Sequence, residues 1–306
     1  GRLVYTWQSA EHRRDGEHIM PVRMEQVSHT YMQGGPFEST AIFNVNLEIR
    51  DGEFVGLIGH TGSGKSTLVQ HMNGLLKPTE GTVIVNETRI VKDSKNLKKV
   101  RQQVGLVFQY PEHQLFEETV EKDVAFGPKN LGLSQEEINE RVREALQLVG
   151  LPYEEIKDRS PFELSGGQRR RVAIAGVLAM KPDILILDEP TAGLDPSGRE
   201  EIFREIQALH KEKGFTIVLV SHSMEDIARL VDRIIVMNQG QVVMTGTPRE
   251  VFARAEELKE IGLDVPQITN LMLALREKGF DVPVDIYTVD QAKQVLRKIL
   301  EGKKHA

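Results

Sequence analysis

A glycine-rich segment with a lysine and a hydroxyl side chain is the strongest chemical signal in the sequence. It fits G-x-x-x-x-G-K-[ST] and consists of Gly59, His60, Thr61, Gly62, Ser63, Gly64, Lys65, Ser66 and Thr67. A strand-length apolar run precedes it and a helix-like run follows, which is the setting of a phosphate-binding loop. The glycines let backbone N–H groups converge on a phosphate. We expect Lys65 to reach the β- and γ-phosphates and Ser66 to ligate Mg²⁺; the alternative is a turn that binds nothing.

Two acidic residues follow a second apolar run. Residues 183–187 predict a buried strand, and Asp188 and Glu189 come at its end. Carboxylates in that position are costly unless they have partners or a chemical role. Asp188 is suited to hold Mg²⁺, and Glu189 is suited to accept the proton of an attacking water. His222 follows the predicted strand at 215–220 and is either structural or part of a ligand crevice at the strand ends.

The pentamer L-S-G-G-Q is a second glycine-containing segment, and it includes Ser165, Gly166, Gly167 and Gln168. Ser165 predicts a helix N-cap, and the glycines leave backbone N–H groups free to meet an anion. Taken alone, the pentamer also fits a plain helix start. Its position downstream of a complete phosphate loop favours anion binding.

Tyr31 lies between two runs, 22–27 and 41–49, that alternate apolar and polar residues. These runs predict strands of an antiparallel patch. An aromatic face can stack on adenine without base-specific hydrogen bonds. An ordinary tyrosine near a strand end explains the residue equally well, so both interpretations stay open.

The composition limits the class of protein. The chain has 306 residues, of which 40% are hydrophobic and 27% charged, enough for a packed core. The net charge of −6 argues against a general nucleic-acid-binding surface. The absence of cysteine excludes disulfides and thiolate metal sites and fits a reducing compartment. No apolar run reaches the ~18–20 residues of a membrane span, so we expect membrane contact only through a partner.

Periodicity predicts further elements. Strands are expected at 81–86 and at 104–109, where Gln109 ends the strand, and a hairpin is expected at 234–244. Residues 119–150 have helical spacing, with turn signals at Gly127-Pro128 and at Gly132.

These patterns divide the chain into three parts. Residues 1–20 are polar and aperiodic, and we interpret them as an appended tail before a native start near Met20. Residues 21–248 contain all the motifs above. Residues 249–306 alternate helical stretches with glycine and proline breaks, which predicts a small, mainly helical C-terminal domain for self-association or an accessory role.

Together the motifs resemble those of an ATP-binding-cassette (ABC) ATPase. The match covers about 22–247 and consists of 59–67, Gln109, 164–168, 184–189, 191–195 and His222, in the family's order. The resemblance implies an α/β P-loop cassette with a mostly parallel core sheet, an antiparallel β patch and an α-helical subdomain at about 110–175.

The resemblance also implies roles for single residues. In such ATPases two cassettes meet head to tail and enclose ATP and Mg²⁺ between the phosphate loop of one and the L-S-G-G-Q element of the other. Tyr31 would stack on adenine, Glu189 would be the general base, and His222 would contact the γ-phosphate. Gln109 would sense Mg²⁺ and the attacking water. Residues Ser165 to Gln168 would serve the nucleotide of the opposite subunit, and Asp195 would couple the two sites.

A finer resemblance is to the ATPases of energy-coupling-factor transporters of the cobalt and vitamin type. It rests on 108–116, 126–128, 170–178 and, in the tail, 265–268 and 271–276. The segments 168–171 and 175–180 look closer to the second ATPase paralogue. The implied partners are a paralogous ATPase in a heterodimer, a transmembrane coupling protein and a substrate-binding membrane subunit. The implied location is the cytoplasmic face of the cell membrane.

The implied activity is ATP hydrolysis that drives the import of a vitamin or metal ion. One alternative is the ATPase of another ABC importer class, for which the tail looks too short to form a regulatory domain. The other is a soluble cassette protein that acts on nucleic acid or ribosomes. A single cassette, no long heptad run and a negative net charge disfavour it, so no nucleic-acid partner is expected.

Overall fold

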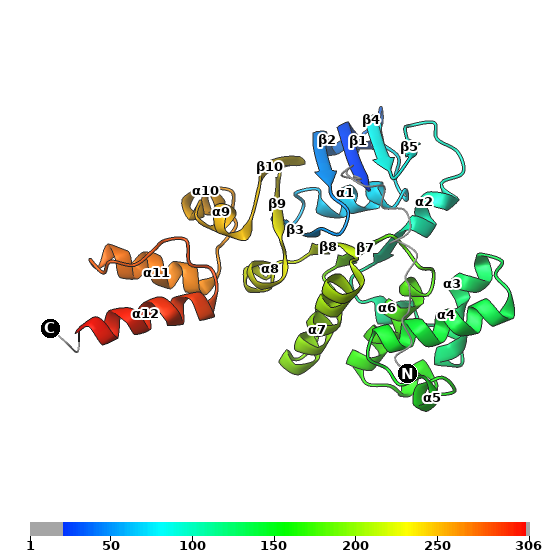
Figure 1. The fold of residues 1–306 in the computed structure, drawn as a ribbon. Coiled ribbons are helices and arrows are strands. Elements are labelled where there is room, and N and C mark those ends of the chain that lie inside the picture. The colour runs from blue at the N-terminus through cyan, green and yellow to red at the C-terminus, as the bar shows by residue number, and fades with distance from the viewer. Residues whose placement is uncertain (1–20, 304–306) are drawn as a thin grey trace, which may run out of the picture.

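The computed structural model describes residues 21–303, in which two β-sheets and their covering helices form the main body (Figure 1). The strands are β1 (Val22–Tyr31), β2 (Ser39–Ile49), β3 (Phe54–Ile58), β4 (Glu80–Val85), β5 (Thr88–Ile90), β6 (Val104–Val107), β7 (Ile184–Asp188), β8 (Thr216–Val220), β9 (Arg233–Asn238) and β10 (Gln241–Gly246). The helices are α1 (Lys65–Met72), α2 (Lys98–Gln103), α3 (Val120–Asn130), α4 (Gln135–Leu148), α5 (Tyr153–Ile156), α6 (Gly166–Leu178), α7 (Pro196–Lys213), α8 (Met224–Leu230), α9 (Pro248–Phe252), α10 (Ala255–Glu260), α11 (Gln267–Glu277) and α12 (Val289–Lys303), with 3₁₀ turns η2 (Pro111–Gln114) and η3 (Pro161–Glu163).

The six-stranded sheet has the order β10-β9-β3-β8-β7-β6, and all neighbours except β9 and β10 run parallel. Its central strands β3, β8 and β7 are mostly apolar, as is typical of strands that are covered on both faces. Leu185 and Leu187 of β7 pack into one hydrophobic cluster, whereas Ile184 and Ile186 pack into the other. The strand period of two therefore divides the core between the helices on one face and the second sheet on the other.

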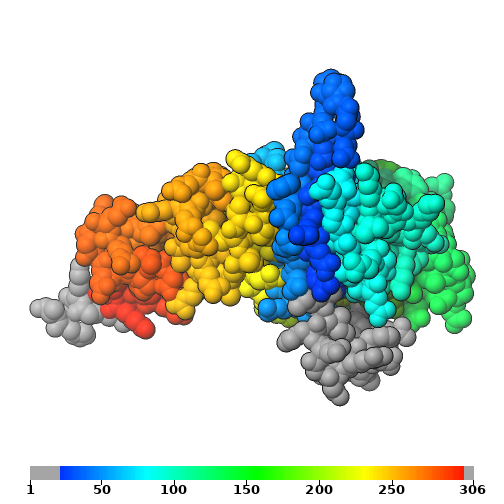
Figure 2. All heavy atoms as spheres, turned by 90° about the horizontal axis from the view of Figure 1, so that it is seen from above, coloured from blue at the N-terminus to red at the C-terminus, as the bar shows by residue number. Residues whose placement is uncertain are grey.

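The second sheet is antiparallel, with the order β2-β1-β4-β5. The cluster that it shares with α1 and the six-stranded sheet includes Val22, Ile49 and Val85. Three register shifts interrupt the pairing of β1 with β2. Strands β1 and β2 form a hairpin, and its end projects from the body as the dark blue segment in Figure 2. Phe37, between the two strands, is 77% exposed.

Helices α3 to α6 form a group beside the edge strand β6. One turn that the sequence predicts within this group is absent. The turn expected at Gly127-Pro128 is wrong, because α3 continues through both residues to Asn130. A Cβ at position 127 would lie 2.7 Å from Cγ of Met180. The glycine therefore allows α3 to approach the segment after α6 closely and does not end the helix.

The C-terminal helices lie at the end of the molecule away from the α3–α6 group (Figure 1). Helices α11 and α12 enclose a small cluster of Met272, Val282, Ile286 and Ala292. The buried Thr269 hydroxyl donates a hydrogen bond of 2.8 Å to the Ile286 carbonyl and ties α11 to the segment before α12.

The other expected elements are present, with small shifts of their ends. The predicted strand at 104–109 ends at Val107, so Gln109 lies two residues beyond it. Ser134, Ser165 and Thr247 cap helices, each within a reciprocal capping box. None of the helices within 21–303 is long and apolar enough to cross a membrane. The interpretation of residues 1–20 as a tail lies outside the described residues.

Removal of a core side chain from the six-stranded sheet tests this packing. Leu219 of β8 is fully buried, so Leu219→Ala should lower the free energy of unfolding by about 2–5 kcal/mol, measured by urea denaturation with circular dichroism. Leu75 is 44% exposed, and Leu75→Ala, the control, should change it by about 0.5 kcal/mol or less. Equal denaturation midpoints for the two variants would contradict the burial of Leu219 in the core of the six-stranded sheet.

Candidate active site

The candidate site lies at the carboxyl edge of the six-stranded sheet. Strands β3, β8, β7 and β6 are parallel neighbours and end together at this edge. The residues that follow them are the phosphate loop after β3, His222 after β8, Glu189 after β7 and Gln109 after β6. The topology therefore gathers four of the sequence motifs on one side of the sheet, where open parallel sheets bind their ligands.

The phosphate loop is held by the turn between β9 and β10. The Gly240 N–H donates to the Ser63 carbonyl at 3.0 Å, and the His60 ring bonds through Nε2 to the Asn238 side-chain oxygen at 2.9 Å. A Cβ at Gly59 would lie 2.5 Å from the Met237 carbonyl oxygen. The loop thus needs glycine where its backbone passes this neighbouring strand.

Lys65, the first residue of α1, points back along the loop. Its ammonium donates to the carbonyls of Gly59 at 2.6 Å and His60 at 3.0 Å. Burial lowers its pKa, and the carboxylates of Glu189 and Asp188 oppose that shift. Ser66 beside it is exposed, so its hydroxyl is accessible.

Glu189 occupies an unusual environment. Its φ of 49° is in the left-handed region, which a non-glycine residue adopts at a cost of about 1–3 kcal/mol. Burial, with a smaller contribution from Asp188, raises its pKa to about 7. Its buried Oε1 has no hydrogen-bond partner among the described residues, and Nε2 of His222 lies 3.5 Å away. An unsatisfied acceptor of this kind suits a group that takes a proton from water.

The groups beside Glu189 have shifted pKa values as well. Burial raises the pKa of Asp188, and Lys65 opposes this shift. Burial lowers the pKa of His222, and the positive charge of Lys65 acts in the same direction. A cluster of perturbed titratable groups at a strand edge is typical of a functional site.

Tyr31 lies next to the phosphate loop. Its hydroxyl is 3.1 Å from Oγ1 of Thr67, and its ring stands edge-on to His29 with centroids 4.6 Å apart. The side chain is 38% exposed, and His71 packs behind His29 at 4.8 Å. Two buried histidines thus support an aromatic ring at the surface, an arrangement that leaves room for a stacked base.

The L-S-G-G-Q element and Asp195 make their own local contacts away from the loop. The Gln168 N–H donates to Oγ of Ser165 at 3.2 Å, and the Ser165 N–H donates to Oε1 of Gln168 at 3.1 Å. A Cβ at Gly166 or Gly167 would meet nothing within 4 Å. Asp195 caps α7 by accepting a 2.7 Å bond from the Gly198 N–H. Gln109 is exposed.

Three residues near the site were not predicted from the sequence. Arg170 and Glu112 form a buried ion pair behind the loops, and Asn238 braces His60. The only signals were the arginine run after Gln168 and an acid next to Pro111, and neither indicated that the two segments meet.

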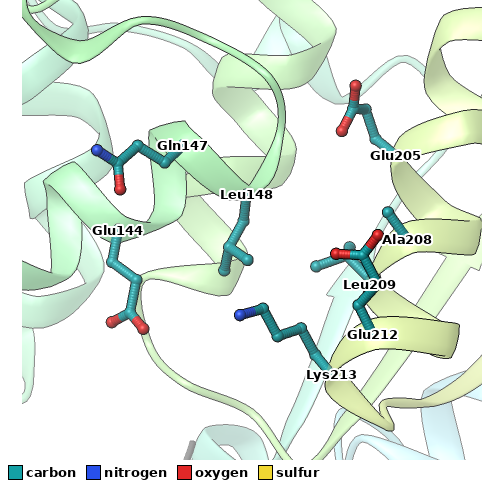
Figure 3. Close-up of a pocket in the computed structure, with 8 residues that line it drawn as sticks. All are labelled: Glu144, Gln147, Leu148, Glu205, Ala208, Leu209, Glu212 and Lys213. Atoms are coloured by element: carbon teal, nitrogen blue, oxygen red, sulfur yellow. The ribbon is translucent and has the colours of Figure 1, made fainter. Parts of the chain in front are cut away.

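A cavity of about 270 Å³ lies away from the motif residues, between α4 and α7 (Figure 3). Its lining residues are Glu144, Gln147 and Leu148 of α4 and Glu205, Ala208, Leu209, Glu212 and Lys213 of α7. The Lys181 ammonium forms an ion pair with the Glu144 carboxylate, with Nζ and Oε2 2.8 Å apart. No group of three or more metal-ligating side chains occurs within the described part of the chain.

Comparisons with known proteins agree with this site. The family model described as ABC transporter matches residues 42–192. A Clostridium tetani protein named energy-coupling factor transporter ATP-binding protein EcfA2 is 59% identical over 284 residues, which cover 93% of this chain and 99% of that protein.

Solved structures give the same result. The cbiO1 protein of Clostridium perfringens, described as part of the ABC transporter complex cbiONQ, matches with a TM-score of 0.71 and 41% identity over 84% of this chain and 99% of its own. A dimeric post-hydrolysis state of the ATP-binding cassette MJ0796, bound to ADP and Pi, matches with a TM-score of 0.65 and 36% identity over 74% of this chain and 98% of its own.

The predicted fold class and ATPase activity are therefore confirmed, as is the resemblance to the second ATPase paralogue. The phosphate loop and the two acids at the sheet edge, Asp188 and Glu189, lie within the residues that the family model matches. This chain belongs to the ATP-binding proteins of energy-coupling factor transporters, within the ABC transporter family, and is an ATPase.

Proposed function

We propose that this chain binds Mg·ATP at the carboxyl edge of its six-stranded sheet and hydrolyses it with Glu189 as general base. The environment of Glu189 carries the proposal. Its carboxylate is buried beside Lys65, one oxygen is unpartnered, and burial raises its pKa to about 7. A base with a pKa near the working pH is ionised and still accepts a proton readily. Lys65 and the backbone N–H groups of the phosphate loop would stabilise the transferring phosphoryl group.

The donors at the sheet edge fit Mg²⁺. The cation prefers hard oxygen ligands and keeps several waters when it binds phosphates. The exposed Ser66 hydroxyl and the Asp188 carboxylate are such ligands, and Gln109 offers an amide oxygen from the loop after β6. When bound, Mg²⁺ would neutralise developing phosphate charge. Tyr31 would hold the adenine, and His222 would donate to the γ-phosphate.

The second half of each site comes from another subunit in this proposal. Ser165, Gly166, Gly167 and Gln168 begin α6 with the glycine Cα atoms facing open space. A helix N-terminus with free N–H groups attracts an anion. The relative MJ0796 is described as dimeric with ADP and Pi bound. We infer that these residues complete the nucleotide site of a paralogous ATPase, and that Asp195 lies between the two sites.

The membrane partners are inferred from relatives and from an aromatic surface. The neighbour cbiO1 is described as part of a transporter complex. Tyr110, Phe116 and Phe126 are 40%, 57% and 46% exposed, and the two phenylalanine rings meet edge to face at 5.0 Å. Exposed aromatic clusters are typical of binding surfaces. We propose that a transmembrane coupling protein docks here, which places the chain at the cytoplasmic face of the membrane, where its ATPase activity powers import through a substrate-binding membrane subunit.

Substitution of Glu189 tests its role as the base. Glu189→Gln keeps the shape but removes the proton acceptor, so phosphate release should fall by about 100-fold or more while ATP affinity persists. ATP should then accumulate in a closed dimer, visible by size-exclusion chromatography with the partner ATPase. Glu260→Gln, at an exposed position on α10, is the matched control. Ordinary turnover by Glu189→Gln would refute the assignment.

The raised pKa of Glu189 predicts a pH dependence. A base acts only when ionised, so kcat/KM should rise as the pH increases through about 7 and fall by about tenfold per unit below it. The ATP affinity of Glu189→Gln over the same pH range is the control, because it reports protonation of the nucleotide alone. A flat kcat/KM between pH 6 and pH 8 would contradict this role.

The aromatic docking surface is tested separately. Phe116→Ser combined with Phe126→Ser should reduce recovery of the membrane partners in a detergent pull-down by about tenfold or more, since loss of a central aromatic anchor commonly costs over 1 kcal/mol. Phe37→Ser, at the exposed end of the β1–β2 hairpin, should leave recovery unchanged. Equal recovery of the membrane partners by both variants would show that the docking site lies elsewhere.

A further inference from the structure

Arg170 is a charged side chain in the interior of the protein. It is 1% exposed and is among the largest fully buried side chains of residues 21–303. A buried guanidinium persists only when its N–H groups are paired, because the unpaired charge is strongly disfavoured. The hydrogen-bond partners of Arg170 therefore show which segments it holds together.

The Arg170 guanidinium makes four hydrogen bonds. Nε and Nη2 donate to the two carboxylate oxygens of Glu112 at 2.9 and 2.6 Å, which is a bidentate fork. Nη1 donates to the backbone carbonyls of Pro190 at 2.9 Å and Ala192 at 2.7 Å. A lysine ammonium has three donors at one point and cannot span these positions.

These partners lie on the segments that surround the proposed catalytic site. Glu112 is three residues after Gln109, and Pro190 directly follows Glu189. Arg170 itself is on α6, the helix that Ser165 caps. One guanidinium therefore joins the loop after β6, the turn after β7 and the start of α6.

The two loops that Arg170 joins are both strained. Tyr110 has a φ of 55° and Glu189 a φ of 49°. Such conformations persist only where surrounding contacts enforce them. The Tyr110 ring lies 5.8 Å from the Arg170 guanidinium, and a Cβ at Gly193 would be 3.2 Å from Cε1 of Tyr110. The loop after β6 thus packs directly on the turn that follows Glu189.

We propose that Arg170 is a positioning residue that transmits the placement of residues 109–116 to the Glu189 turn through its fork on Glu112 and its bonds to Pro190 and Ala192. This inference rests on the proposed function, in which Glu189 is the base and residues 110–116 contact a membrane partner. Displacement of Glu112 moves the guanidinium, and the guanidinium holds the two carbonyls next to Glu189. Partner docking thereby sets the position of the base.

The experiment compares substitutions at the two ends of the ion pair with a matched control on α6, in the assembled complex of the paired ATPases and their membrane proteins. Arg170→Lys keeps the charge but loses the fork, and Glu112→Gln keeps the shape but loses the carboxylate. Arg171→Lys is the control. Arg171 contacts Glu201 at 3.4 Å and the Gly150 carbonyl at 3.4 Å, neither of which belongs to the loops.

The expected result is a separation of kcat from KM. Arg170→Lys should lower kcat about 10- to 100-fold, as misplacement of a catalytic group does, with KM for ATP changed by about twofold or less. Glu112→Gln should lower kcat in the same direction, and Arg171→Lys should retain the unaltered rate.

Several outcomes would overturn the inference. Equal kcat for Arg170→Lys and Arg171→Lys would show that the fork does not position the base. A loss of kcat accompanied by a similar loss of ATP affinity and a lowered melting temperature would show a purely structural role. If Arg170→Lys fails to fold, full activity of Glu112→Gln is sufficient to reject the proposal. Failure of the proposed function is distinct, because Glu189→Gln would then retain ordinary turnover whatever the rate of Arg170→Lys.

Discussion

Burial of three ionisable side chains at one sheet edge is the constraint on which the site depends. Loss of solvent disfavours the charged forms of Lys65, Asp188 and Glu189, and the opposite charges offset one another only in part. The Lys65 ammonium donates to two carbonyls of the phosphate loop. The edge therefore favours a ligand that carries negative oxygens together with a cation, because such a ligand complements both kinds of charge.

The parallel sheet brings motifs that are distant in the sequence together at one edge. Strands that are buried on both faces are fixed by packing against the helices and against the antiparallel sheet, so their carboxyl ends have defined positions. The loops beyond these ends are held by polar contacts and by packing on one another. Asn238 bonds to His60, and Arg170 joins the loop after β6 to the turn after Glu189. The positions of the site residues therefore depend on both the sheet and these contacts between loops.

The sequence was sufficient to predict the fold class, the strand order along the chain and the motifs, because each depends on local pattern. The phosphate loop is nine contiguous residues, and its helix and strand flank it directly. The expected turn at Gly127-Pro128 failed because a glycine that permits close packing resembles one that ends a helix. The Arg170–Glu112 pair was invisible because it joins residues 58 positions apart, and no local pattern encodes such a contact. The assigned roles of the site residues and the domain boundaries stay predictions.

The capping box at the start of α6 has a consequence for what this surface can recognise. Oγ of Ser165 already accepts a hydrogen bond from the Gln168 N–H. A serine hydroxyl has one proton, and with its oxygen engaged in this way the proton is what it can best offer outward. The hydroxyl and the first N–H groups of the helix therefore present the same polarity. An acceptor lone pair of a neighbouring molecule is therefore favoured at this end of the helix over a cation.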